Sequence, residues 1–154
     1  MSTFLILHNI RSAHNVGSIF RTADGAGVSK IYLSGYTPSP VDRFGRVQPE
    51  IKKTSLGASG TVPYESVEDI QTLLLRMKED GIVVVAVEQT ERAIDFKTFV
   101  QRGDVAYIFG NEITGVEPEI LEKVEEHIMI PMQGSKESLN VSVCVGIILF
   151  SKQR

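Results

Sequence analysis

The chain has 154 residues, of which 42% are hydrophobic and 23% are charged, and its formal net charge is −3. These proportions are typical of one globular domain with a hydrophobic core and exclude an intrinsically disordered chain. No apolar run approaches the roughly 18 residues that cross a bilayer, and residues 1–8 have neither the basic leader nor the apolar length of a signal peptide. With a single cysteine, Cys144, and so no intrachain disulfide, we expect a cytoplasmic protein that does not associate with membranes.

Short apolar runs rich in β-branched residues alternate along the chain with helical patterns. The strand pattern occurs at residues 3–8, 30–34, 82–88, 104–109 and 127–130. The helical pattern occurs at residues 15–26, 66–79, 117–126 and 139–152. Ser66 is expected to cap the second of these helices, with Asp69 in its first turn. The alternation predicts an α/β fold of three layers around a parallel sheet, and we expect residues 1–154 to form this single domain.

The last predicted helix, residues 139–152, is apolar nearly all the way round its axis. A helix of this kind is buried on more than one side, which in a domain of this size favours a surface covered by a second subunit. The alternative is a core helix wrapped tightly by its own chain. Cys144 lies in this helix and is expected to be a small core residue rather than a nucleophile.

The charges are unevenly distributed along the chain. Residues 1–53 carry seven Lys or Arg and three Asp or Glu, a balance of +4, whereas the rest carries nine bases and sixteen acids, a balance of −7. Such asymmetry favours a positive face that binds nucleic acid, although a chance division of surface charge gives the same balance. The basic residues in or just after a loop predicted at 35–49 are Arg43, Arg46, Lys52 and Lys53.

The usual motifs of nucleotide-binding and hydrolytic α/β domains are missing. The chain has no G-x-x-x-x-G-K-[ST] phosphate loop, no G-x-G-x-x-G after its first strand and no G-x-S-x-G nucleophile turn. His8, His14 and His127 have no Cys or Glu partners at metal-ligand spacing, so we expect no metal site. His8 and His127 flank apolar strands and are expected to be packed, hydrogen-bonded structural residues.

Three polar segments remain, and each follows a predicted strand. They are Asn9-x-Arg11-x-x-x-Asn15-x-Gly17-x-x-x-Arg21, Gly110-x-Glu112-x-x-Gly115 and Pro131-Met132-…-Ser138-Leu139-Asn140. In α/β sheets ligands bind at the carboxyl ends of the strands, and glycine permits strained turns close to a ligand. Each segment alone is also compatible with an ordinary turn, and Ser138 with a helix N-cap. Asn140 is harder to explain as a cap if Ser138 already serves as one.

In this combination and order, the segments resemble the signature motifs of the SpoU/TrmH family of RNA ribose methyltransferases, within the SPOUT superfamily. The resemblance extends over nearly the whole chain, from Phe4 to Phe150. It implies S-adenosylmethionine as methyl donor, the ribose 2′-hydroxyl of tRNA or rRNA as acceptor, a homodimer and a C-terminal deep trefoil knot. Knots are almost absent from proteins, and neither composition nor periodicity predicts one here.

The same resemblance implies roles for individual residues. Arg21 matches the catalytic arginine of the family. The other polar positions of the catalytic site match Asn15, Glu112, Ser138 and Asn140. The cofactor-binding positions match Gly110, Ile130, Met132 and Leu139, and a further wall of that pocket is expected from Glu88, Gln89 and Thr90. Arg11 is expected to contact an RNA phosphate.

The resemblance implies that Arg21 either removes the hydroxyl proton or stabilises the developing alkoxide as a fixed cation. The second role is physically easier, because a guanidinium rarely deprotonates. We expect no separate RNA-binding domain of the kind found in longer family members, so RNA choice is expected to depend on the basic surface residues or on an accessory protein. The alternative function is a non-catalytic RNA-binding or ribosome-assembly factor. The full polar set argues against it, because a binding protein has no need of all these side chains.

Overall fold

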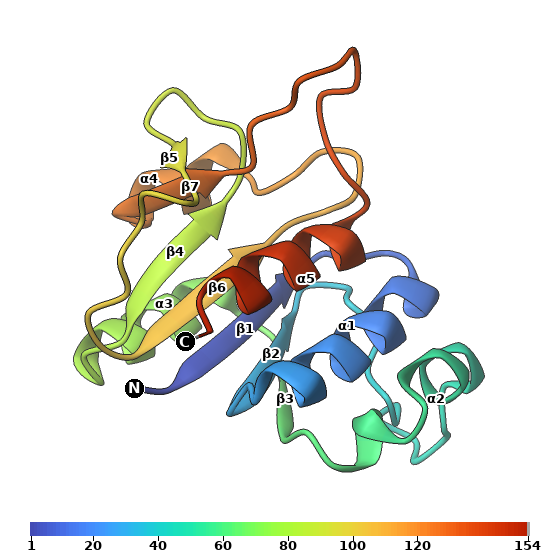
Figure 1. The fold of residues 1–154 in the computed structure, drawn as a ribbon. Helices are drawn as coiled ribbons and strands as arrows, with labels where there is room; N and C mark the ends of the chain where they lie inside the picture. Colours follow the sequence, from blue (N-terminus) through green and yellow to red (C-terminus); the bar gives the residue numbers. More distant parts are fainter. Residues whose placement is uncertain (154) are drawn as a thin grey trace.

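Seven parallel strands form one sheet at the centre of the computed structural model, which describes residues 1–153 (Figure 1). The strands are β1 (Thr3–His8), β2 (Lys30–Ser34), β3 (Tyr64–Val67), β4 (Val83–Val87), β5 (Ile94–Asp95), β6 (Val105–Phe109) and β7 (Glu126–Met129). Their order across the sheet is β3-β2-β1-β6-β4-β7-β5, and every neighbouring pair is parallel. The predicted parallel α/β sheet is confirmed.

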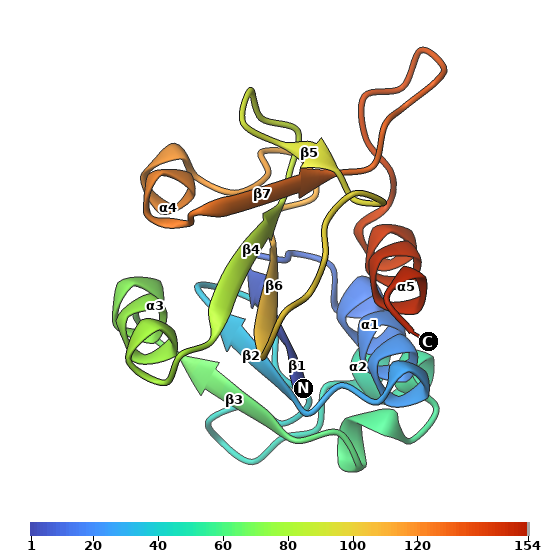
Figure 2. The ribbon, with the colours of Figure 1, turned by 60° about the vertical axis from the view of Figure 1, so that its left-hand side comes forward.

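Helices cover both faces of the sheet, which gives the predicted three layers (Figure 2). One face carries α1 (Ala13–Ala26), α2 (Pro49–Ser55) and α5 (Val141–Ser151), together with a 3-10 turn, η1 (Ala58–Gly60). The other face carries α3 (Ile70–Glu79) and α4 (Pro118–Lys123). The short elements α2, η1, β3 and β5 were not predicted. No helix within residues 1–153 is both long enough and apolar enough to cross a membrane.

Successive side chains of the buried strands alternate between two cores, one under each helical layer. In β6, Val105, Tyr107 and Phe109 pack toward α1 and α5. Ala106 and Ile108, which alternate with them, pack toward α3 and α4. All five side chains are buried, as expected for a central parallel strand covered on both faces.

Helices α1 and α2 approach closely at Gly17. A Cβ atom at this position would overlap the Thr54 hydroxyl and lie 2.8 Å from the carbonyl oxygen of Ile51. Only glycine therefore allows the two helices to pack at this distance. Gly17 belongs to the first polar segment, and its role in this structure is packing.

The predicted helix over residues 66–79 starts too early. Its first residues belong to β3, which ends at Val67, and α3 begins only at Ile70. Asp69 rather than Ser66 caps this helix, since its side chain accepts a hydrogen bond from the backbone N–H of Gln71 at 2.9 Å. The strand escaped prediction because it lies at the edge of the sheet and has no fully buried side chain.

The start of the last helix also differs from the prediction. Helix α5 begins at Val141, and its N-cap is Asn140, whose side chain accepts a hydrogen bond from the backbone N–H of Ser142 at 2.9 Å. The alternative explanation of Ser138 as the N-cap is therefore not supported. Asn140 thus has a structural role of its own, as an ordinary N-cap.

Candidate active site

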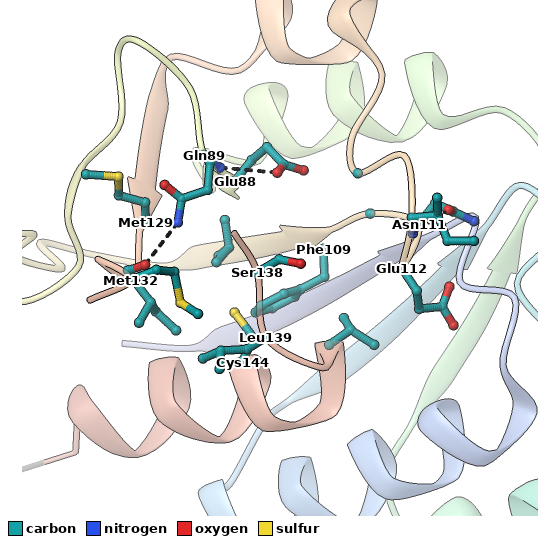
Figure 3. A pocket seen from close by; sticks show the side chains of 16 residues that line it. Glu88, Gln89, Phe109, Asn111, Glu112, Met129, Met132, Ser138, Leu139 and Cys144 are labelled. Carbon is teal, nitrogen blue, oxygen red and sulfur yellow. Dashed lines mark hydrogen bonds between the residues drawn. The ribbon is translucent and has the colours of Figure 1, made fainter. Parts of the chain in front are cut away.

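The sheet order places the carboxyl ends of β1, β6, β4 and β7 side by side, so the loops that follow these strands meet at one edge. A pocket opens there between the loops after β4, β6 and β7 and the first turn of α5 (Figure 3). We call it the main pocket. Its walls are formed by Val87, Glu88, Gln89, Phe109, Gly110, Asn111, Glu112, Ile113, Gly115, Met129, Ile130, Met132, Ser138, Leu139, Val141 and Cys144.

The loop after β6, residues 110–115, is the most tightly built wall of this pocket. A Cβ atom on Gly110 would overlap the backbone of Gly115, and Gly115 itself has a φ of 70°. The backbone N–H groups of Asn111 and Gly115 each donate to the carbonyl oxygen of the other residue. The Asn111 side-chain oxygen accepts two further backbone N–H groups, from Ile113 and Thr114. The loop is therefore held by its own hydrogen bonds and by a close approach that only glycine permits.

Two carboxylates tie this loop to neighbouring segments. Glu88, after β4, accepts a hydrogen bond from the backbone N–H of Val116 at 2.9 Å. Glu112 accepts the backbone N–H groups of Arg11 and Ser12, each at 2.9 Å, just before α1. Burial raises the pKa of Glu112, but these backbone hydrogen bonds outweigh burial and hold the pKa below its ordinary value of 4.5. An ionised Glu112 thus joins the second polar segment to the first.

Cys144 lines the main pocket and is only partly buried. Burial, with a smaller contribution from the carboxylate of Glu88, raises the pKa of the Cys144 thiol to about 12. The side chain is therefore a protonated thiol at neutral pH and a poor nucleophile. The prediction of a small buried core residue holds in part, because Cys144 packs against the core but is incompletely buried and also lines the pocket.

Half of the pocket wall consists of residues that the sequence predicted as site residues. They are Glu88, Gln89, Gly110, Glu112, Ile130, Met132, Ser138 and Leu139. Gln89 also links two of the loops, since its Nε2 donates to the carbonyl oxygen of Ile130 at 3.0 Å. The structure thus brings the second and third polar segments and the β4 loop together around one space.

Four of the twelve residues predicted for the catalytic and cofactor-binding sites lie outside the main pocket. The Thr90 hydroxyl lies 2.8 Å from Nδ1 of His127, away from this space. Asn15 is buried on α1 and contacts the site only through Glu112, to which its Nδ2 donates at 3.4 Å. Asn140 caps α5, and Arg21 is exposed on α1.

The other half of the wall was not assigned to the site from the sequence, although Gly115 belongs to the second polar segment. These residues are Val87, Phe109, Asn111, Ile113, Gly115, Met129, Val141 and Cys144. All but Cys144 lie within three residues of a predicted site residue. Position at the end of a strand was the available signal for Val87, Phe109 and Met129. It was weak, because most of the eight residues are apolar and resemble ordinary core residues.

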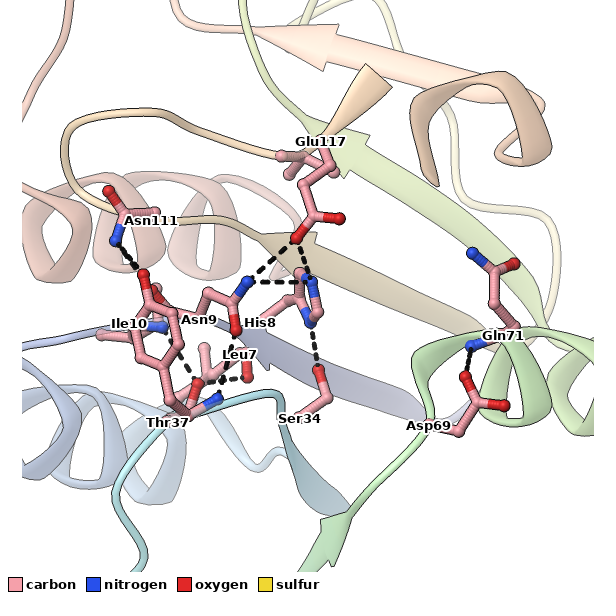
Figure 4. A network of polar contacts seen from close by, with 12 residues as sticks. Leu7, His8, Asn9, Ile10, Ser34, Thr37, Asp69, Gln71, Asn111 and Glu117 are labelled. Carbon is pink, nitrogen blue, oxygen red and sulfur yellow. Dashed lines mark hydrogen bonds and ion pairs between the residues drawn. The ribbon is translucent and has the colours of Figure 1, made fainter. Parts of the chain in front are cut away.

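A second set of polar contacts lies at the ends of β1 and β2 (Figure 4). His8 is buried, with Nδ1 2.8 Å from Oγ of Ser34 and Nε2 3.0 Å from Oε1 of Glu117. These two contacts connect His8 to the end of β2 and to the residue before α4. Asn9, which has a φ of 56°, also donates to Glu117 at 2.9 Å. The predicted structural role of His8 is confirmed.

His127 is likewise buried, and its ring contacts Thr90 and the carbonyl oxygens of Leu121 and Val124. It therefore joins β7 to the end of α4, as expected of a structural histidine. Within the described residues, no three His, Cys, Asp or Glu side chains are arranged to hold a metal ion.

A sequence profile described as the SpoU rRNA Methylase family matches residues 2–150. The chain belongs to this family. It is 34% identical over 146 residues to the tRNA (guanosine(18)-2′-O)-methyltransferase of Aquifex aeolicus, and this match covers 95% of this chain and 66% of that protein. It is also 34% identical over 156 residues to the 23S rRNA (guanosine-2′-O-)-methyltransferase RlmB of Pectobacterium atrosepticum. That match covers 100% of this chain and 60% of the relative.

A solved structure of similar fold is the AdoMet-bound rRNA methyltransferase from Sinorhizobium meliloti. Its TM-score is 0.86 at 28% identity, and the match covers 98% of this chain and 55% of that one. The present SpoU-family chain spans less than two thirds of the length of the curated relatives it matches first.

In this SpoU-family chain, the residues expected to contact RNA lie on the surface. Arg43 and Arg46 flank the exposed ring of Phe44, with their guanidinium carbons 4.8 and 5.0 Å from its centroid. Arg46 is also paired with Asp42, since its Nε donates to the carboxylate at 2.9 Å. The remaining three are exposed and comprise Arg11 before α1 and Lys52 and Lys53 on α2.

Proposed function

We propose that this chain transfers a methyl group from S-adenosylmethionine to a ribose 2′-hydroxyl of tRNA or rRNA. The observation that carries the proposal is the family match over residues 2–150, which includes every residue of the main pocket. The names of the relatives support the acceptor class, since one acts on tRNA and another on 23S rRNA. The AdoMet-bound neighbour supports the donor.

The main pocket fits this donor, which combines a flat adenine and a ribose with a charged amino-acid end. Phe109 and Ile130 provide apolar walls, and Gln89 and Ser138 provide polar groups. Gly110 adds backbone to the wall and has no room for a side chain, because a Cβ atom there would overlap Gly115. The residues that we propose to hold the donor are Glu88, Gln89, Gly110, Ile130, Met132 and Leu139. Thr90 is left out because its hydroxyl faces His127.

The methyl group on the sulfonium of this donor is electrophilic without further activation. The protein therefore has to place the 2′-oxygen in line and assist the loss of its proton. The Glu112 carboxylate already accepts two backbone N–H groups. We propose that it positions the loop and the start of α1, supported by Asn15, rather than acting as the base. Ser138 and Asn140 are proposed to orient the acceptor at the entrance to α5.

Arg21 requires a different explanation, because it does not line the main pocket of its own chain. It lies on α1, which packs against α5, and α5 leaves Val143 and Phe150 about half exposed, at 51% and 49%. A second copy that covers this apolar face would form the expected homodimer. We propose that Arg21 acts at the pocket of that second copy, where its guanidinium stabilises the developing alkoxide or holds the neighbouring phosphate.

The deep C-terminal knot also remains a proposal. Lys152 at the end of α5 donates from Nζ to the carbonyl oxygens of Phe96 and Phe99, at 2.6 and 2.7 Å. The last helix is thus held between α1 and a segment that precedes β6. The proposal of a knot rests on the family membership. An experimental structure traced from end to end tests this. We further propose that residues 1–154 act as one catalytic domain in the cytoplasm, with RNA selected by the basic surface residues or by an accessory protein.

The test is transfer of labelled methyl from S-adenosylmethionine to total RNA from cells that lack the modification. Label in nuclease-resistant 2′-O-methyl dinucleotides is the expected result. Arg21→Ala should lower the rate by about 100-fold or more, since it removes a charge that stabilises the transition state. Arg21→Lys should fail as well, because lysine lacks the planar fork of the guanidinium. Near-normal turnover by Arg21→Lys would contradict both roles proposed for this residue.

Two controls separate the remaining possibilities. Binding of S-adenosylhomocysteine without any methyl transfer would favour the non-catalytic RNA-binding factor on the same fold. Mixing Arg21→Ala with the pocket variant Met132→Asp, each inactive alone, should restore part of the activity if each site draws on both subunits. No restoration in confirmed mixed dimers would place Arg21 at its own chain's site.

A further inference from the structure

A second hollow adjoins the main pocket and shares the 110–115 loop as a wall. It lies between Arg11, Ser12 and Tyr36 on one side and residues 111–114 on the other. Three of its residues, Asn111, Glu112 and Ile113, line the main pocket as well. A nucleotide whose ribose lies at this shared wall would have its base or its phosphate in the second hollow, which we call the acceptor hollow.

Tyr36 is the unusual residue in the acceptor hollow, because it is exposed and yet fixed at both ends. Its exposed fraction is 60%. Its backbone N–H donates to Oδ1 of Asn9 at 3.1 Å, and its hydroxyl accepts a hydrogen bond from Nδ2 of Asn111 at 2.8 Å. An exposed tyrosine ordinarily gains nothing from such attachment, whereas a ring that receives a ligand gains from being held in place beforehand.

The backbone next to Tyr36 is built to allow this placement. Gly35 has a φ of 63°, and a Cβ atom on it would overlap Oδ1 of Asn9. Asn9 in turn has a φ of 56° and is held by Glu117. The contacts around His8 therefore support the position of an aromatic ring at the surface, in addition to joining β1 to β2.

The chemistry of the acceptor hollow suits an unpaired nucleotide. An aromatic face stacks on any base, and single-stranded RNA sites are recognised in this way. Arg11 lines the same hollow and is exposed, and within residues 1–153 its guanidinium has no hydrogen-bonded partner. It is thus available to bind a phosphate.

We propose that the acceptor hollow holds the base of the acceptor nucleotide, stacked on Tyr36, with Arg11 at an adjacent phosphate. The inference rests on the proposed function and specifies where its RNA substrate is bound. It also implies that the target base is unpaired when bound, since a paired base has no free face to offer the ring.

The test compares Tyr36→Leu, which keeps apolar bulk but removes the aromatic face, with Tyr36→Phe, which keeps the ring. Tyr36→Leu is expected to raise the apparent KM for the RNA and to weaken its binding by about 5- to 150-fold, the range for loss of one stacked base. Tyr36→Phe keeps the ring but loses the bond from Asn111 that holds it, so its loss is expected to be clearly smaller than that of Tyr36→Leu. Affinity for S-adenosylhomocysteine should be unchanged in both, because the ring does not line the main pocket. Leu75→Ala, an exposed change on α3, serves as the matched control.

The probe is unfractionated RNA from cells that lack the modification, used in filter binding and in methyl transfer. If the wild type methylates this RNA and Tyr36→Leu behaves like Tyr36→Phe, the inference is overturned while the proposed function stands. If the wild type transfers no methyl group, the proposed function fails and the inference fails with it. A Tyr36→Leu protein that also loses S-adenosylhomocysteine affinity would mean that Tyr36 supports the fold rather than a base.

Discussion

The two sides of the 110–115 loop are built by different means. On the side of β4 and β7, the main pocket has apolar walls such as Phe109 and Ile130, and the loop backbone closes against itself at Gly110. On the side of β1 and β2, the acceptor hollow is organised by side-chain hydrogen bonds that run through His8, Asn9 and Asn111. One side depends on packing and the other on polar contacts.

This difference corresponds to what each side is proposed to bind. A small donor of fixed shape is held best by a close-fitting, largely apolar cavity with a few polar groups. An RNA strand is held at exposed groups that are fixed before it arrives. A single loop serves both sides because Glu88 and Glu112 anchor it to β4 and to α1.

The largest effect is expected at Gly110, on the packed side. In Gly110→Ala the new methyl group would overlap the backbone of Gly115, so the loop has to move. We expect loss of S-adenosylhomocysteine binding in calorimetry and a fall of about 1–3 kcal/mol in the free energy of unfolding. Gly134→Ala is the control, because nothing lies within 4 Å of a Cβ atom there. Retained binding by Gly110→Ala would show that the loop is less rigid than its contacts suggest.

The reactivity of Cys144 measures how far the main pocket is closed to reagents in solution. Because burial raises the pKa of its thiol to about 12, little thiolate is present at pH 8. Alkylation by iodoacetamide should be slower than for an ordinary cysteine by about a thousandfold. The chain contains one cysteine, so intact-mass measurement follows this site alone. S-Adenosylhomocysteine should slow the reaction further, and an unchanged rate would place the ligand outside the main pocket.

Glu112 lines both the main pocket and the acceptor hollow, and its removal should destabilise the loop that separates them. In Glu112→Gln one carboxylate oxygen becomes an N–H group that faces backbone donors, which we expect to lower the free energy of unfolding by about 1.5–3 kcal/mol at pH 7. Urea denaturation measures this. Exposed Glu119→Gln on α4 is the control and should change it little.

The pH dependence of the same variant provides an independent check. The folded-state pKa of Glu112 is lowered below 4.5, so its stabilisation is complete above that pH and is lost as the pH falls below it. The wild type should therefore lose more stability than Glu112→Gln between pH 5 and pH 3. Parallel curves for the two proteins would mean that the carboxylate contributes nothing through its charge.

The smallest effect is expected on the polar side, at Ser34. Ser34→Ala leaves Nδ1 of buried His8 without its partner, which should cost about 1 kcal/mol of the free energy of unfolding. Methyl transfer should show a raised KM for RNA with unchanged S-adenosylhomocysteine affinity, because the change acts on the Tyr36 side only. Exposed Ser29→Ala is the control. A loss of S-adenosylhomocysteine affinity would show that the two sides are not independent.

Much of this fold was readable from local patterns. The five predicted strands were all found, because buried strands carry apolar, β-branched runs whose signal is local. Edge strand β3 and the short α2 were missed for the same physical reason, since neither is covered well enough to require an apolar pattern. The sequence left the cap of α5 open between Ser138 and Asn140, because both residue types cap helices and only the backbone angles distinguish them.

The sequence by itself determined the α/β class, the order of the three polar segments and the family that they indicate. Only the tertiary structure decided which residues meet. Glu112 binds the backbone of Ser12 across 100 residues, and Asn111 reaches Tyr36 across 75, because the sheet order places β6 beside β1. Such contacts leave no trace in local periodicity. They arise when parallel strands far apart in the chain end at the same edge, and there the chemistry of this protein is assembled.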